Sequence, residues 1–167
     1  MKTHLMMLAA GLALTPSLAM AAPDFSGTWV RDNAQTSQES YPLYWLARTT
    51  PAPAFRPNQE LVVQIQQANG TLTVTNPTEP QRRYMLDGRP HSVRTDTGVQ
   101  KADVTASLGA NALTIATVQP YGGMPGNVSA TITETWQLSP DGKVLTVSTV
   151  RASPAKQETI KEVYTRR

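Results

Sequence analysis

Glu134 is the residue whose position in this sequence most needs a chemical explanation. It lies between Ile132 and Trp136 in a stretch where apolar and polar residues alternate, so it falls on the apolar face of an expected strand. A carboxyl group there costs free energy unless it is paired, hydrogen-bonded or protonated. One interpretation is a polar anchor for a ligand, or a general acid/base with a raised pKa. The other is structural: an ion pair with Arg82 or Arg151, or a position at the wet rim of the fold.

His91 is the second candidate for acid/base chemistry. A lone histidine is also commonly a hydrogen-bonded structural residue, and both interpretations stay open. The chain has no Cys, and no set of His, Asp and Glu with the spacing of metal ligands, so we expect no metal and no cofactor. Gly-x-Ser-x-Gly and phosphate-binding glycine motifs are absent too. The sequence therefore indicates no motif-defined class of enzyme.

The N-terminus has the features of a secretory signal peptide. Residues 1–22 contain a short basic head, an apolar run from Leu5 to Leu14 that is too short to span a bilayer, and a small-residue exit. Cleavage is expected after about Ala21 or Ala22, leaving 23–167 as one domain. The expected location is the periplasm or the outside of the cell.

Charge and cysteine content limit the classes of partner that we expect for this protein. The chain has 15 Lys and Arg and 12 Asp and Glu, and removing Lys2 with the leader leaves 14 against 12. So small a surplus, without a clustered basic run, gives no basis for nucleic-acid binding. Without Cys there is no disulfide and no lipoprotein anchor, so no stable membrane attachment is expected. Nothing in the sequence indicates the oligomeric state.

The elements that must position Glu134 are strands. Alternating segments separated by Gly, Pro, Asn and Asp predict an all-β fold, an up-and-down antiparallel β-barrel of eight to ten strands. The expected strands are 25–30, 61–66, 71–75, 82–86, 91–96, 99–108, 111–118, 128–138, 144–150 and 158–165.

The links between these strands predict a cup. If every link joins neighbouring strands, the links fall alternately at the two ends of the barrel. The tight turns then share one end: Asn69-Gly70, Asp87-Gly88, Gly109-Ala110 and Asp141-Gly142. The long links share the other: 31–59, 76–81, 119–127 and 152–157. The alternation requires 91–96 and 99–108 to be separate strands. The first long link is rich in aromatic residues and is expected to cover the mouth of the barrel.

Short motifs add a family resemblance. Phe25-Ser26-Gly27-Thr28-Trp29 resembles the Gly-x-Trp opening of the lipocalin superfamily, part of the calycin-type barrels. Tyr84 to Gly88 and Glu134 to Val147 are similar to segments of a group of small exported bacterial lipocalin-like proteins, mostly uncharacterised. The likeness extends from Asp24 to Tyr164.

The resemblance implies a barrel whose closed end is sealed in a particular way. In lipocalins the tryptophan of the first strand packs beneath an arginine near the last strand. Trp29 matches the tryptophan, and Arg166 or Arg167 is expected to supply the guanidinium.

The leading functional hypothesis is that the barrel interior binds a small apolar or amphipathic molecule. The residues expected to line the cavity are Tyr84, Val104, Ile132 and Trp136, with Glu134 and Arg82 orienting a polar end and Tyr44, Trp45 and Tyr121 covering the mouth. One alternative is a barrel enzyme, an isomerase, cyclase or lyase, using Glu134 and His91 as acid/base groups. Another is a barrel filled by its own side chains, with a structural or interaction role.

Overall fold

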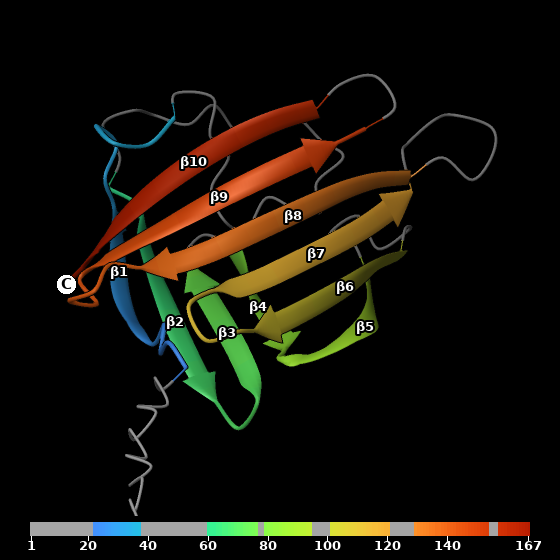
Figure 1. Cartoon of the computed structure of the whole chain (residues 1–167), viewed down its shortest axis with the longest axis horizontal. Coiled ribbons are helices and arrows are strands. Elements are labelled where there is room, and N and C mark those ends of the chain that lie inside the picture. Colours follow the sequence, from blue (N-terminus) through green and yellow to red (C-terminus); the bar gives the residue numbers. More distant parts are fainter. Residues whose placement is uncertain (1–21, 38–59, 77–78, 95–100, 121–128, 154–156) are drawn as a thin grey trace, which may run out of the picture.

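The computed structural model describes residues 22–37, 60–76, 79–94, 101–120, 129–153 and 157–167. These residues form ten strands (Figure 1), which confirms the all-β expectation. The strands are β1 (Gly27–Arg31), β2 (Val62–Ala68), β3 (Thr71–Asn76), β4 (Glu79–Met85), β5 (Asp87–Arg94), β6 (Lys101–Leu108), β7 (Leu113–Pro120), β8 (Ser129–Leu138), β9 (Val144–Ala152) and β10 (Gln157–Arg166).

The strands make one antiparallel meander that nearly closes on itself. Their order in the sheet is β4-β3-β2-β1-β10-β9-β8-β7-β6-β5, so the first strand pairs with the last. Within the described residues no hydrogen-bonded register joins β4 to β5, which leaves a seam between them. The two strands are connected through Leu86 alone, whose N–H donates to Gly70 O at 2.8 Å.

The links alternate between the two ends as the sequence predicts. The short links β2–β3, β4–β5, β6–β7 and β8–β9 share one end, which we call the closed end, and the other links share the loop end. The alternation holds because β5 and β6 are separate strands. In Figure 1 the β8–β9 turn lies beside the C-terminus, at the closed end.

Turn chemistry explains two of these links. Asn69 and Gly70 both have positive φ, 52° and 70°, as a two-residue hairpin turn of type I′ requires. Asp141 accepts hydrogen bonds from Ser139 Oγ at 2.6 Å and Lys143 N at 3.1 Å, which confirms its role as a turn former.

Asp87 is also a turn former, but the corner lies one residue earlier than expected. Asp87 accepts a hydrogen bond from Arg89 N at 3.0 Å, and Gly88 has a φ of 70°. Both already belong to β5, whose register with β6 shifts between Asp87 and Pro90. The strand expected at 91–96 therefore begins four residues earlier, at Asp87. The turn residues Asp87 and Gly88 are part of the strand because they lie in a β-bulge.

The closed end is filled by large apolar side chains. Phe25 and Trp136 meet edge to face, with ring centroids 6.0 Å apart, and Trp29 Nε1 donates to Phe25 O at 2.9 Å. The fully buried side chains of this cluster also include Leu72, Leu113, Leu145 and Tyr164. This packing plugs one end of the barrel.

An arginine seals the cluster from outside. The guanidinium carbon of Arg166 lies 4.4 Å from the centre of the Trp29 ring, which confirms the expected cation–π contact. Gly27 makes room for it, since a Cβ at this position would lie 2.9 Å from Arg166 Nη1. The φ of Gly27, +144°, is also one that residues with a Cβ rarely adopt. The Gly-x-Trp motif therefore has a steric cause.

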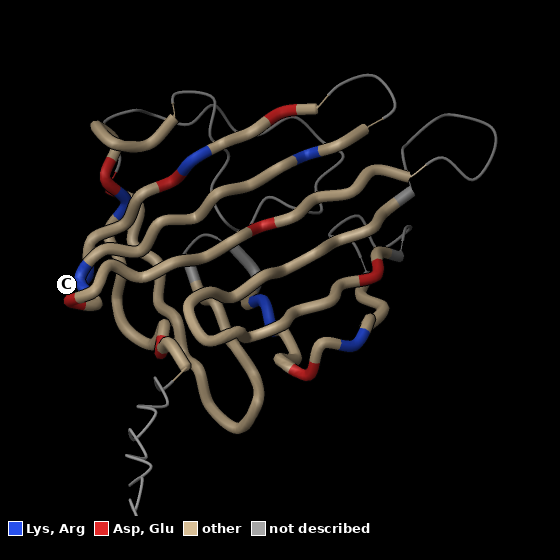
Figure 2. The backbone as a smooth tube through the Cα atoms, in the orientation of Figure 1, with Lys and Arg blue, Asp and Glu red and all other residues tan. Residues whose placement is uncertain are grey.

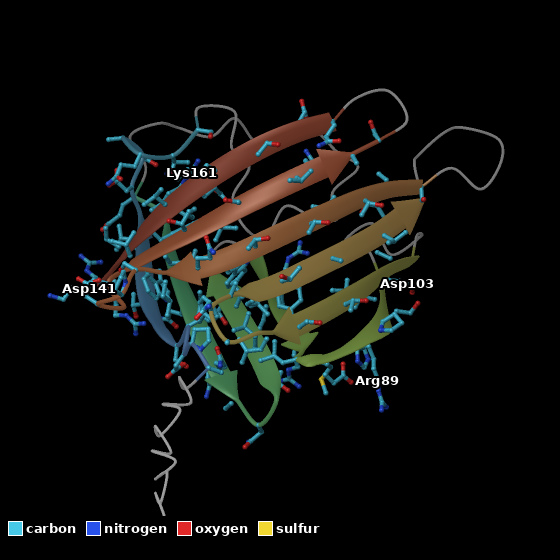
Figure 3. The ribbon with its side chains drawn as sticks, viewed as in Figure 1. Arg89, Asp103, Asp141 and Lys161 are labelled. Carbon is cyan, nitrogen blue, oxygen red and sulfur yellow. The ribbon has the colours of Figure 1, made fainter. Side chains whose placement is uncertain are left out.

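Charged residues are scattered over the tube in Figure 2, with no long run of one sign. The residues labelled in Figure 3, Arg89, Asp103, Asp141 and Lys161, are exposed and point away from the barrel. In the described ranges, no helix has the length and apolar character needed to cross a membrane.

Candidate functional site

Glu134 faces the interior of the barrel from the middle of β8. Its cross-strand partners are Ile115 on β7 and Thr149 on β9, which share its inward face. Only 1% of the residue is exposed, so the interpretation as a position at the wet rim is wrong. The alternation of β8 therefore buries a carboxyl group among apolar neighbours.

One oxygen of this carboxyl group is satisfied and the other is not. Trp136 Nε1 donates to Glu134 Oε2 at 2.8 Å. Glu134 Oε1 is buried and has no hydrogen-bond partner among the described residues. Native proteins leave few buried polar atoms in this state, so this oxygen needs a partner outside the described residues. Of the two expected ionic partners, Arg82 acts on Glu134 through its charge, which lowers the pKa of that carboxyl group.

The surroundings favour the protonated acid. Burial raises the pKa of Glu134 from the ordinary value of 4.5 to about 8, and the Trp136 hydrogen bond and the charge of Arg82 oppose this only in part. At neutral pH the side chain is therefore mostly a neutral group that can donate a hydrogen bond.

A second buried carboxyl group, which the sequence analysis missed, lies on β10. Glu162 is 1% exposed, its Oε1 lies 3.7 Å from Arg31 Nε, and it accepts a hydrogen bond from the Tyr164 hydroxyl at 3.3 Å. Burial raises the pKa of Glu162 to about 8, although the charge of Arg31 lowers it; the charge of Glu134 raises it further. The charge of Glu134 therefore acts on the carboxyl group of Glu162 inside the barrel.

A signal for Glu162 exists in the sequence. Ile160, Glu162 and Tyr164 alternate along β10, and Glu162 pairs with Val147, a buried residue on the inward face of β9. Reading the alternation through Glu162 would have placed its carboxyl group inside.

Tyr84 and Arg82 reach the same interior from β4. Their cross-strand partners, Leu72 and Val74, are buried core residues, so both predicted residues occupy the inward face. Burial raises the pKa of the Tyr84 hydroxyl, and the charge of Glu134 raises it further; Arg82 opposes this through its charge and through a hydrogen bond to Tyr84. Glu134 and Tyr84 are therefore electrostatically coupled although β8 and β4 are not neighbours in the sheet.

The other predicted site residues lie in different environments. Ile132 and Trp136 are buried, and Val104 packs against the core. His91 Nε2 lies 3.0 Å from Asp87 Oδ1 in a contact at the surface, which agrees with the structural interpretation of this histidine. The remaining three, Tyr44, Trp45 and Tyr121, fall outside the described residues. In the part of the chain that the structure describes, no group of three or more acidic or histidine side chains is placed to hold a metal ion.

Comparison with known proteins supports the fold and leaves the family open. No protein-family model and no curated protein sequence matches the chain. Among solved structures, the fold is similar to that of a zebrafish ileal bile acid-binding protein complexed with cholic acid, with a TM-score of 0.52 and 19% identity. The match covers 86% of this chain and 98% of that one. The chain thus shares the antiparallel β-barrel fold of that protein, which confirms the fold that the sequence resemblance implies.

Proposed function

We propose that this barrel binds a small apolar or amphipathic molecule in its interior, with Glu134 as the polar anchor. The observation that carries the proposal is Glu134 Oε1, a buried oxygen without a hydrogen-bond partner in the described residues. Leaving such an atom unsatisfied costs about 1–3 kcal/mol. A ligand that supplies the missing hydrogen bond recovers that free energy.

The distribution of side-chain sizes supports an interior with space toward the loop end. Large aromatic and aliphatic side chains fill the closed end, whereas the inward positions nearer the loop end include Ala102, Thr117 and Thr149. A barrel of ten strands is wider than a barrel of eight strands. The interior of an eight-stranded barrel is only wide enough for its own side chains or one small ligand. We therefore expect the small side chains of this wider barrel to leave volume for a ligand.

The similar solved structure supports the class of ligand. That protein is described as binding bile acid and holds cholic acid, an amphipathic molecule. A barrel of the same fold with a polar group deep in an apolar interior suits the same class. In this proposal Tyr84, Val104, Ile132 and Trp136 contact the apolar part, and Arg82 assists Glu134.

We extend the proposal to the remaining expectations from the sequence. Tyr44, Trp45 and Tyr121 cover the mouth, and residues 1–22 direct export to the periplasm or the outside, as in the small exported lipocalin-like group. The mass of the mature protein tests the export step, because cleavage after Ala21 or Ala22 fixes the new N-terminus. A mature protein that retains residues 1–22 contradicts it.

Native mass spectrometry and thermal shift test the binding. We expect purified protein, incubated with a panel of fatty acids, alcohols and sterols, to retain one ligand per chain and to unfold at higher temperature. Glu134→Ala should weaken the best ligand about tenfold or more, as loss of one buried hydrogen bond predicts. Gln137→Ala, on the exposed face of the same strand, is the matched control. A panel without any retained ligand or thermal shift overturns the proposal.

A second candidate, a barrel enzyme, is favoured by one observation. A carboxyl group whose pKa is raised to about 8 suits a general acid/base near neutral pH. Glu134→Gln separates the two functions, because it should abolish turnover in an enzyme and only weaken affinity in a binding protein. The surface contact of His91 with Asp87 makes Glu134 the stronger acid/base candidate.

A further inference from the structure

We infer that the ligand group that meets Glu134 is an uncharged hydroxyl, so that the barrel selects an alcohol over a carboxylic acid or an amine of the same shape. This inference rests on the proposed function and names the chemical class of the ligand's buried end.

The geometry of the carboxyl group sets the kind of partner it needs. Because Trp136 Nε1 donates to Oε2, Oε2 acts as an acceptor and the acidic proton belongs on Oε1. Oε1 is the oxygen without a partner among the described residues. As an O–H group it both donates and accepts, and a ligand hydroxyl can do the same in return.

The apolar surroundings keep the carboxyl group uncharged. Ile115 and Ile132, both at most 2% exposed, lie on the same inward face as Glu134. An ionised carboxylate holding a single hydrogen bond in such surroundings is costly, and burial accordingly raises the pKa of Glu134 to about 8. The site therefore offers an O–H group at neutral pH.

A ligand carboxylate is disfavoured at this position. Its charge would have to leave water for the apolar surroundings of Glu134, and an ionised group in such surroundings is costly. The cations of the cluster already have acidic or hydroxyl partners: Arg31 lies 3.7 Å from Glu162, and Arg82 bonds to Tyr84.

A ligand amine is disfavoured for a different reason. An ammonium group would bind Glu134 well only in its ionised form, and burying both charges costs desolvation free energy on each side. The positive charge of Arg82, which acts on Glu134, would also repel it. A neutral hydroxyl avoids both costs.

Three ligands that differ only at the head group test the inference: 1-dodecanol, dodecanoic acid and dodecylamine. Their dissociation constants are measured at pH 7 by isothermal titration with wild type, Glu134→Gln and Glu134→Leu. For wild type we expect dodecanol to bind at least tenfold more tightly than either of the others. Glu134→Gln, whose amide is neutral and both donates and accepts, should keep that order. Glu134→Leu should weaken dodecanol about tenfold and leave no preference.

Controls separate failure of the inference from failure of the proposed function. Gln137→Leu, on the outer face of β8, should leave all three constants unchanged. Binding of dodecanoic acid or dodecylamine as tight as dodecanol overturns the inferred class while interior binding stands. If none of the three ligands and no sterol alcohol binds, the proposed function is wrong and the inference falls with it. The wild-type comparison decides the matter even where Glu134→Leu does not fold.

Discussion

Replacing Glu134 with glutamine should make the stability of this protein less dependent on pH. In the folded state burial raises the pKa of Glu134 to about 8, against an ordinary value of 4.5. Below about 4.5 both the folded and the unfolded chain hold the proton, so the shift has no effect. Between 4.5 and 8 the unfolded chain releases the proton and the folded protein keeps it. The free energy of unfolding therefore falls as pH rises through this window and levels off above it.

The slope follows from the number of protons involved. One proton held only by the folded state lowers the free energy of unfolding by about 1.4 kcal/mol for each pH unit. Between pH 5.5 and 7.5 Glu134 alone should cost about 3 kcal/mol. Glu162, whose pKa is also raised to about 8, contributes in the same direction and remains in the variant. Glu134→Gln should therefore reduce the slope without abolishing it.

Other acidic groups act outside this window. The pKa values of Asp24, Asp32, Asp87 and Asp141 lie below their ordinary value of 3.8. Their contribution is present above that value and is lost as pH falls through the lowered one. Measurements from pH 5.5 upward leave these four groups ionised in both states.

Urea unfolding at pH 5.5, 6.5 and 7.5 measures the effect. We expect Glu134→Gln to be close to wild type at pH 5.5 and more stable than wild type by about 2–3 kcal/mol at pH 7.5. Glu60→Gln is the control, because this carboxyl group is exposed and its removal should leave the slope unchanged. Parallel pH profiles for wild type and Glu134→Gln would refute the assignment of a buried neutral acid.

Three further variants probe the surroundings of this group and the seal of the closed end. Trp136→Phe removes the N–H that Glu134 Oε2 accepts, so the pKa of Glu134 should rise and the levelling of stability should move to higher pH; an unchanged profile argues against that bond. Gly27→Ala should destabilise by about 1–3 kcal/mol in urea unfolding, because of its φ and the close Arg166 guanidinium. Gly109→Ala, where the nearest atom is 3.4 Å away, should change stability by less than about 1 kcal/mol, and equal losses would contradict the steric argument. Arg166→Gln should cost about 0.5–1 kcal/mol by the same measurement, and no loss would mean that the cation–π contact is not stabilising.

The sequence predicts most of the fold because the fold is local. Each strand except the first and last pairs with its neighbours along the chain or lies at the seam, so alternation and turn residues specify nearly every contact. Gly27 and Trp29 even indicate how the closed end is sealed, although only coordinates choose Arg166 over Arg167 for the guanidinium. The seam between β4 and β5 has no sequence signal, because it depends on how far the whole sheet curls.

The sequence predicts one of the two buried carboxyl groups of the candidate site and misses the other. Glu134 stands out because its neighbours on the inward face of β8 are apolar. Glu162 does not, since Lys161 and Glu158 surround it with charge and the alternation of β10 is hard to recognise from composition. Arg31 was assigned to the first long link, yet it closes β1 and lies 3.7 Å from Glu162. Contacts of this kind arise from register across the β1–β10 pair, which a linear pattern does not encode.

The pairing of β1 with β10 governs the order in which this protein assembles. Thr165 and Val30 meet across 135 positions, whereas the hairpins β2–β3 and β8–β9 join residues only a few positions apart. Loop-closure entropy favours the nearby pairs, so the meander should grow strand by strand and close last. Before β10 pairs with β1, β1 has one neighbouring strand and one exposed edge. The cluster around Trp29 is incomplete at that stage, because Arg166 and Tyr164 belong to β10. Refolding should therefore be limited by a late step that buries tryptophan, after most of the sheet has formed.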